Sequence, residues 1–171
     1  MADLIHKLKH GGGHIKEGSA LKSGILLKEN NPEQGTIKLG DLVGRNLIIG
    51  IPGAFTPPCS SHVPGYVQHY DAFVQKGIKD IYVVAVNDAF VTMAWKEKLG
   101  ASASQVHFLA DDDGSFTSEV GMLFDAKGLL GNKRSKRYVL VVDDGIVKHV
   151  FVESEVANVE VTKAENVLGK I

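Results

Sequence analysis

The stretch NLIIGIPGAFTPPC, residues 46–59, decides the fold of this chain. Its first six residues are mostly apolar and too few for a helix, which favours a buried strand at 46–51. From Cys59 to Lys76 apolar side chains recur at helical spacing, so we expect a helix that begins at the cysteine. The cysteine therefore lies where a strand passes into a helix.

The chain beyond this junction repeats the alternation of strand and helix. We expect strands at 80–86 and 106–110 and helices at 89–99 and 116–123. This βαβαβ order predicts a parallel core, because consecutive parallel strands are joined through helices.

The last part of the chain predicts a change of strand direction. Strands expected at 137–142 and 146–152 flank Asp143-Asp144-Gly145, a hairpin signal, so this pair should be antiparallel. Thr162 and Glu165 have the spacing of a capping box for a closing helix at 162–168. A central mixed β-sheet flanked by helices, with a cysteine at a strand-to-helix junction, is an α/β fold of the thioredoxin-like arrangement.

The first 45 residues are glycine-rich and weakly patterned, with short extended pieces expected at 24–28 and 36–39. We interpret this segment as packed on the core rather than as a separate domain. The chain of 171 residues is thus expected to be a single domain, 1–171, with an N-terminal extension at 1–35.

Composition argues against several classes of partner. Nineteen basic and 20 acidic residues give a formal net charge of -1, which offers no general field for nucleic acid or an anionic membrane. The longest apolar runs, such as 139–142, are far too short to span a bilayer. We expect a soluble intracellular protein, cytoplasmic in the first place, with mitochondria and peroxisomes as alternatives, because a lone thiol stays reduced inside cells.

Cys59 is the only cysteine, so no disulfide can form within the chain. It is either a small buried hydrophobic residue or a reactive thiol. The prolines before it stiffen the approach to the sulfur, and the positive end of a helix dipole and a nearby arginine favour the nucleophilic thiolate. This context favours a reactive thiol.

Reduction of a peroxide by such a thiolate needs donors around a small oxygen substrate. The Thr56 hydroxyl can accept from one peroxide oxygen and bridge to the sulfur, and the Cys59 amide at the helix start supplies a further donor. Pro52 and Phe55 would shield the pocket from bulk water.

These residues resemble a known family. Pro52-x-x-x-Thr56-x-x-Cys59 is similar to the active-site motif of the peroxiredoxins, and the form PGAFTPxC resembles the type II, peroxiredoxin-five-like subgroup. The resemblance covers roughly residues 36–171 and includes the segments 62–66, 86–91, 131–138 and 144–148. It implies a peroxidatic Cys59, polarising side chains of Thr56 and Arg137, a shielding Pro52, and reduction of hydrogen peroxide and alkyl hydroperoxides without a cofactor. It also implies a homodimer packed near the active-site helices.

Two features depart from the family pattern. No resolving cysteine exists, and Val161 occupies the position where one relative keeps it. The mechanism must therefore use one cysteine, whose sulfenic acid is reduced by an external thiol such as glutathione with glutaredoxin, or thioredoxin. The spacing from Cys59 to Pro64 is also one residue shorter than in most relatives.

Two other functions stay open on the residues alone. In a redox relay or chaperone-like binding protein, Cys59 would pass its oxidation to a partner, and turnover with a small thiol would distinguish this class from a peroxidase. A cysteine hydrolase needs a general base beside the thiol, and none of the seven histidines belongs to a recognisable nucleophile motif.

The remaining candidate residues have structural interpretations. His62 is expected to cap or pack the helix, and helical spacing places Phe90, Met93 and Trp95 in the core or at a dimer contact. Histidines at 6, 10 and 14 would align on a helix, but the glycines at 11–13 interrupt it. We therefore expect no metal site.

Overall fold

The computed structural model describes residues 13–171, and a five-stranded sheet of order β3-β2-β1-β6-β7 forms the centre of that part of the chain. Its strands are β1 (Arg45–Ile51), β2 (Asp80–Ala85), β3 (His107–Ala110), β6 (Tyr138–Asp143) and β7 (Ile146–Val152). The first three strands are parallel, whereas β6 is antiparallel to both β1 and β7. The predicted mixed sheet is confirmed.

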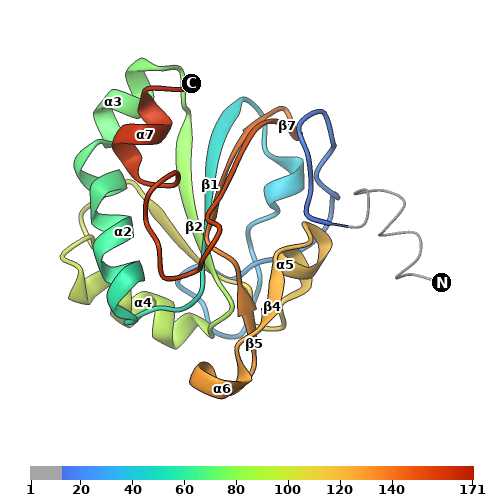
Figure 1. The fold of residues 1–171 in the computed structure, drawn as a ribbon, viewed down its shortest axis with the longest axis vertical. Coiled ribbons are helices and arrows are strands. Elements are labelled where there is room, and N and C mark those ends of the chain that lie inside the picture. The colour runs from blue at the N-terminus through green and yellow to red at the C-terminus, as the bar shows by residue number, and fades with distance from the viewer. Residues whose placement is uncertain (1–12) are drawn as a thin grey trace.

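Helices cover both faces of this sheet (Figure 1). One face carries α2 (Pro57–Gln68), α3 (Tyr70–Gln75), α4 (Ala89–Lys98) and α7 (Ala164–Leu168). The opposite face carries α5 (Ser115–Glu119) and the described N-terminal segment, residues 13–44, which includes the 3₁₀-helix η1 (Leu39–Asp41).

Alternate side chains of the central strands enter two separate hydrophobic cores. Leu47 and Ile49 pack with the face of α2, whereas Ile48 between them packs with residues of the N-terminal segment and α5. All three are fully buried, and each contributes about 1.5–3 kcal/mol relative to an exposed side chain. Because both faces are covered, β1 is almost continuously apolar.

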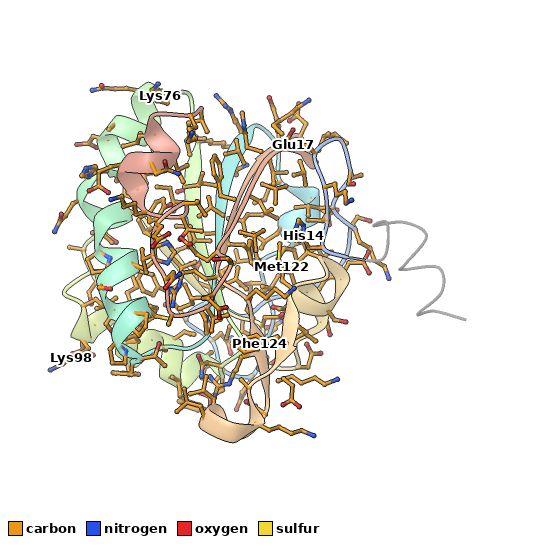
Figure 2. The ribbon with its side chains drawn as sticks, viewed as in Figure 1. His14, Glu17, Lys76, Lys98, Met122 and Phe124 are labelled. Atoms are coloured by element: carbon orange, nitrogen blue, oxygen red, sulfur yellow. The ribbon has the colours of Figure 1, made fainter. Side chains whose placement is uncertain are left out.

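A small arm extends from the α5 side of the molecule. It consists of β4 (Leu123–Asp125), α6 (Lys127–Leu130) and β5 (Lys133–Ser135), with β4 and β5 paired antiparallel. The expectation of a helix through residue 123 was wrong here, because α5 ends at Glu119 and the chain turns at Gly121 with φ +73°. Figure 2 labels Phe124, which belongs to this arm, and Met122 two residues before it, which is fully buried.

Two helix boundaries differ from the prediction. The helix expected at 59–76 begins at Pro57, because prolines fit a first turn in which N–H groups have no helical acceptor, and it is interrupted at His69. The capping box was wrong as well. The closing helix begins at Ala164 after Lys163, and the Thr162 hydroxyl donates to Glu153 instead.

The N-terminal segment hydrogen bonds to the sheet. Gly18 N donates to the Val147 carbonyl over 2.8 Å, and isolated bridges pair Leu27 with Ile37 and Lys28 with Ala110. The two predicted extended pieces thus meet each other through one bridge. Between residues 13 and 171 no helix is long and apolar enough to cross a membrane.

Candidate active site

Cys59 lies in the first turn of α2, after the N-cap residue Thr56. Pro57 and Pro58 precede it in the helix and carry no N–H group, so the Cys59 amide is the first N–H donor of the helix. Amides of a first turn have no acceptor within their own helix. A fully buried thiol and a backbone donor without a helical partner therefore belong to the same residue.

Arg137 reaches the thiol through the register of the sheet. β1 and β6 are antiparallel with Gly50 opposite Tyr138, so the residue before Tyr138 lies beside the end of β1, where the chain turns toward α2. Val139 and Val141 pack in the core beneath α2. Since side chains alternate along a strand, Arg137 shares their face.

Arg137 is 1% exposed, and its guanidinium makes three hydrogen bonds. Nη2 donates to Cys59 Sγ over 3.3 Å, Nη1 lies 3.1 Å from His62 Nδ1, and Nε donates to the Val156 carbonyl over 2.9 Å. Among the described ion pairs none joins Arg137 to a carboxylate. A buried cation without a carboxylate favours a negative charge on the adjacent sulfur.

His62 is the second ionisable neighbour of Arg137. Burial, and then the positive charge of Arg137, lower the pKa of His62 from 6.5 to about 4, so the ring is neutral at physiological pH. Its Nε2 is 3.0 Å from the Thr162 carbonyl oxygen. Both ring nitrogens are occupied, so His62 cannot serve Cys59 as the general base that a cysteine hydrolase requires.

The hydroxyl proton of Thr56 is already engaged in a hydrogen bond. The hydroxyl donates to the Gly53 carbonyl over 2.8 Å, so it does not donate to the Cys59 sulfur, and its remaining lone pairs can accept a hydrogen bond. The loop before it is held by Asn87, whose Oδ1 accepts from Ala54 N over 3.0 Å. Phe55 adopts φ +66°, a left-handed conformation that costs about 1–3 kcal/mol in a residue other than glycine.

A pocket of about 550 Å³ opens beside these residues. Pro52, Thr56 and Arg137 form one part of its wall, and Pro52 is buried. The rest of the lining is mostly apolar and includes residues of the arm and of the loop after β7, namely Phe124, Leu129, Leu130, Val156 and Ala157. Phe55, expected as a second shield, is 51% exposed and does not line this pocket.

The structure thus brings Cys59 and Arg137 into contact and places Thr56 and Pro52 at the pocket next to them. Sequence reasoning did not select His62 for this site, although its place three residues after Cys59 put it on the same side of the helix. His6 and His10 lie outside the described residues. Across residues 13–171 no cluster of three or more His, Cys, Asp or Glu side chains could hold a metal ion.

Arg137 donates a hydrogen bond to the thiol sulfur, and neither Thr56 nor His62 is placed to remove a proton from it. Such surroundings stabilise a thiolate and the oxygen that leaves when a peroxide bond breaks. On a mixed sheet of this order, with the thiol at the start of a helix, they define a thiol-dependent peroxidase.

Comparison with known proteins agrees with this class, and the chain belongs to the Redoxin family, whose model matches residues 16–168. It is 50% identical over 158 residues to Peroxisomal membrane associated protein 20 of Schizosaccharomyces pombe, covering 92% of this chain and 99% of the relative. It is 42% identical over 139 residues to the mitochondrial Peroxiredoxin-2F of Arabidopsis thaliana, covering 80% and 69%. Reduced Prx3 of Vibrio vulnificus in complex with hydrogen peroxide superposes with a TM-score of 0.81 at 34% identity, covering 92% and 99%.

The resemblance to the peroxiredoxin-five-like subgroup is therefore confirmed, and so is the thioredoxin-like fold. The protein is a thiol-dependent peroxidase, and its single cysteine fits a one-cysteine mechanism.

Proposed function

We propose that Cys59 is the peroxidatic nucleophile and that Arg137, Thr56 and Pro52 form its peroxide site. The observation that carries this proposal is the 3.3 Å hydrogen bond from Arg137 Nη2 to the Cys59 sulfur, made inside the protein by an arginine without a carboxylate partner among the described ion pairs. A charge-assisted hydrogen bond of this kind stabilises the negative charge of the thiolate. The same donor can stabilise the negative charge that develops on a peroxide oxygen during the reaction.

The chemical step follows from these positions. The thiolate attacks one peroxide oxygen, the S–O bond forms and the O–O bond breaks, and the second oxygen leaves as hydroxide or alkoxide and takes up a proton. Arg137 and the Cys59 amide donate to the reacting oxygens, while Thr56, whose proton is committed to Gly53, accepts from the peroxide O–H. Pro52 excludes water from one side. Cys59 becomes a sulfenic acid.

The pocket wall favours substrates with an apolar body. Leu129 and Leu130 of α6 and Phe124 of β4 line the same pocket as Thr56 and Arg137. An alkyl hydroperoxide can place its hydrocarbon part against them, which contributes about 25 cal/mol per Å² of apolar surface removed from water. We propose both hydrogen peroxide and alkyl hydroperoxides as substrates.

The return half of the cycle needs a thiol from outside the chain, because Cys59 is the only cysteine. An external thiol condenses with the sulfenic acid to a mixed disulfide and water, and a second thiol then releases Cys59 and leaves as a disulfide. We propose glutathione with glutaredoxin, or thioredoxin, as the reductant. A cytoplasmic location suits this chemistry, and the peroxisomal and mitochondrial names of two relatives keep those compartments as alternatives.

We propose further that the chain acts as one domain and assembles as a homodimer near the active-site helices. Phe55 is 51% exposed and Phe90 at the start of α4 is 70% exposed. The bond from Ala54 N to Asn87 Oδ1 holds their two segments together. In sedimentation experiments Phe90→Glu should weaken the dimer, whereas Leu26→Glu, at a 52% exposed position of the N-terminal segment, should not. A wild-type monomer at every accessible concentration would remove this proposal.

A steady-state assay tests the proposed cycle. Wild-type protein should consume many equivalents of hydrogen peroxide or tert-butyl hydroperoxide with a glutathione and glutaredoxin system or with thioredoxin, and Cys59→Ser should consume none above background. Consumption of a single equivalent with every reductant, followed by transfer of the oxidation to another protein, would instead favour the redox relay.

A further inference from the structure

His62 is a buried residue beside the site that the proposed reaction does not directly use. The ring is 2% exposed and lies between the Arg137 guanidinium and the loop that joins β7 to α7. On one side Nδ1 is 3.1 Å from Arg137 Nη1, and on the other Nε2 is 3.0 Å from the Thr162 carbonyl oxygen.

These two partners determine the tautomer of the ring. A carbonyl oxygen only accepts, so Nε2 must carry the proton that it donates to Thr162. A guanidinium only donates, so Nδ1 must present its lone pair to Arg137. Both bonds form together only when His62 is neutral and protonated at Nε2, and the lowered pKa of about 4 agrees with this state.

The far side of the ring has a fixed support. Thr162 donates its amide and its hydroxyl to Glu153 Oε1 over 3.0 and 2.9 Å, and Glu160 N donates to the same oxygen. The Tyr66 hydroxyl also donates to the Thr162 carbonyl. The acceptor that orients His62 is thus held by a buried network rather than by a mobile loop.

The near side of the ring limits how Arg137 can turn. Nε is held by the Val156 carbonyl and Nη1 by His62, which leaves Nη2 directed at the sulfur. A planar group held at two points has one orientation, whereas the same group held only at Nε can rotate its remaining donors away from the sulfur. Removing the His62 acceptor would also leave Nη1 buried without a partner.

We propose that His62 is a positioning residue for peroxide reduction, whose unprotonated Nδ1 accepts from Arg137 and so directs Nη2 at the Cys59 sulfur. This inference rests on the proposed role of Arg137 and adds a residue that acts through it.

Two substitutions separate the two bonds of the ring. In His62→Asn the side-chain oxygen can occupy the place of Nδ1 and still accept from Arg137, but the bond to Thr162 is lost. In His62→Gln the amide reaches the place of Nε2 and can still donate to Thr162, but the acceptor for Arg137 is lost. The second-order rate constant of Cys59 oxidation is measured for both by stopped flow, with circular dichroism to establish folding.

The proposal predicts that His62→Gln slows oxidation by about tenfold or more, while His62→Asn stays within about threefold of wild type. Equal losses in both, loss only in His62→Asn, or loss in neither would each overturn it, because none requires the acceptor at Nδ1. Arg137→Ala, measured in the same series, distinguishes failure of the proposed role of Arg137 from failure of the proposed role of His62. An unchanged rate in Arg137→Ala removes the proposed role of the arginine itself, whereas a slow Arg137→Ala beside a fast His62→Gln removes only the role of His62.

A measurement on the wild-type protein needs no substitution. Nitrogen-15 NMR of the His62 ring should show a neutral imidazole protonated at Nε2 near neutral pH. A ring protonated at Nδ1, or at both nitrogens, cannot accept from Arg137 and would overturn the proposal.

Discussion

Arg137 Nη2 lies 3.3 Å from Cys59 Sγ, although 78 positions separate the two residues in the chain. The contact depends on the antiparallel pairing of β1 with β6, which brings the residue before Tyr138 beside the end of β1. It therefore requires the finished sheet. The thiol acquires its cationic neighbour only when β6 has docked.

Substitution of this arginine tests its role. Arg137→Ala should slow peroxide reduction by at least about tenfold, roughly 1.4 kcal/mol of transition-state stabilisation. Arg137→Lys keeps the charge but cannot donate to the sulfur, His62 and Val156 at the same time. Its rate should therefore fall between those of wild type and Arg137→Ala. Stopped-flow rates measure both, and wild-type rates in both variants would remove the assignment.

A second prediction concerns the contribution of the Thr56 hydroxyl to the rate of Cys59 oxidation. Thr56→Val has the same shape without the hydroxyl and should also slow oxidation by at least about tenfold, because the peroxide O–H loses its acceptor and the Gly53 carbonyl its donor. Thr56→Ser keeps the oxygen and should recover most of the rate. If Cys59 is oxidised equally fast in Thr56→Val and Thr56→Ser, the hydroxyl has no part in the chemistry.

The periodicity of the central strands was enough to predict the sheet. The strand expected at 146–152 is present as Ile146–Val152, and the one expected at 46–51 begins one residue earlier, at Arg45. These strands are buried on one or both faces, so burial determines their residue pattern. The strands and helix of the arm have only three or four residues each. Such segments are too short to show the hydrophobic periodicity of a strand or of a helix.

The site was predictable where it depends on a local motif. Cys59 and Thr56 share one turn and one helix start, so their spacing shows their relationship. The role inferred for His62 depends instead on the carbonyl of Thr162, which an irregular loop positions. A backbone carbonyl has no residue-type signal, and so the sequence could not indicate where Arg137 and His62 find their acceptors.

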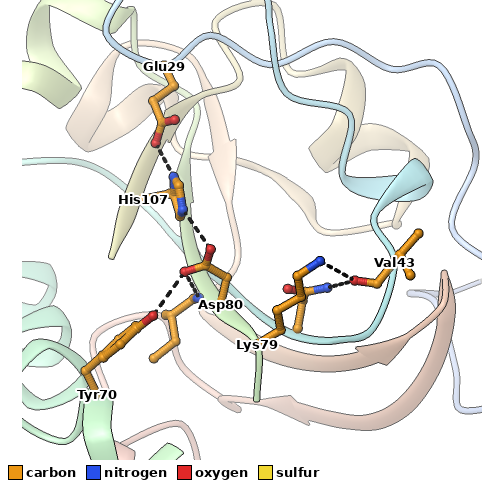
Figure 3. Close-up of polar contacts among 8 residues, drawn as sticks. Glu29, Val43, Tyr70, Lys79, Asp80 and His107 are labelled. Carbon is orange, nitrogen blue, oxygen red and sulfur yellow. Dashed lines mark hydrogen bonds and ion pairs between the residues drawn. The ribbon is translucent and has the colours of Figure 1, made fainter. Parts of the chain in front are cut away.

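A second histidine, His107 at the start of β3, is expected to make stability depend on pH. In Figure 3 His107 lies between two carboxylates, with Nδ1 2.7 Å from Glu29 and Nε2 3.1 Å from Asp80. Tyr70 contacts the other oxygen of Asp80. The Tyr82 ring stacks on His107 with centroids 4.6 Å apart. The hydrogen bond to Glu29 raises the pKa of His107 above 6.5 against the opposing effect of burial, and Asp80 raises it further.

The raised pKa of His107 determines how stability changes with pH. Because the folded pKa exceeds the unfolded value near 6.5, the stabilisation is complete below that pH and is lost as pH rises through the folded pKa. Urea unfolding across this interval should show the loss in wild type and a flatter profile in Glu29→Gln. The exposed Glu33→Gln serves as the matched control. Equal slopes in wild type and Glu29→Gln would show that His107 does not titrate as stated.

The close contact of Gly50 with Tyr138 predicts a site sensitive to one methyl group. A Cβ on Gly50 would lie 1.9 Å from a ring carbon of Tyr138, which is fully buried. Gly50→Ala should therefore destabilise the fold by about 1–3 kcal/mol or more, while Gly128→Ala, with nothing within 4 Å of its Cβ, should not. Chemical denaturation compares the two, and equal stabilities would contradict the packing described.

The central claim is that Cys59 reacts with peroxide as an activated thiolate and forms a sulfenic acid. Intact mass after a substoichiometric pulse of hydrogen peroxide, with rapid trapping by a sulfenic-acid reagent, tests it most directly, with Cys59→Ser as the control. The account predicts fast and nearly complete trapping at Cys59 and none in the control. Oxidation at the slow rate of an ordinary free thiol would contradict it.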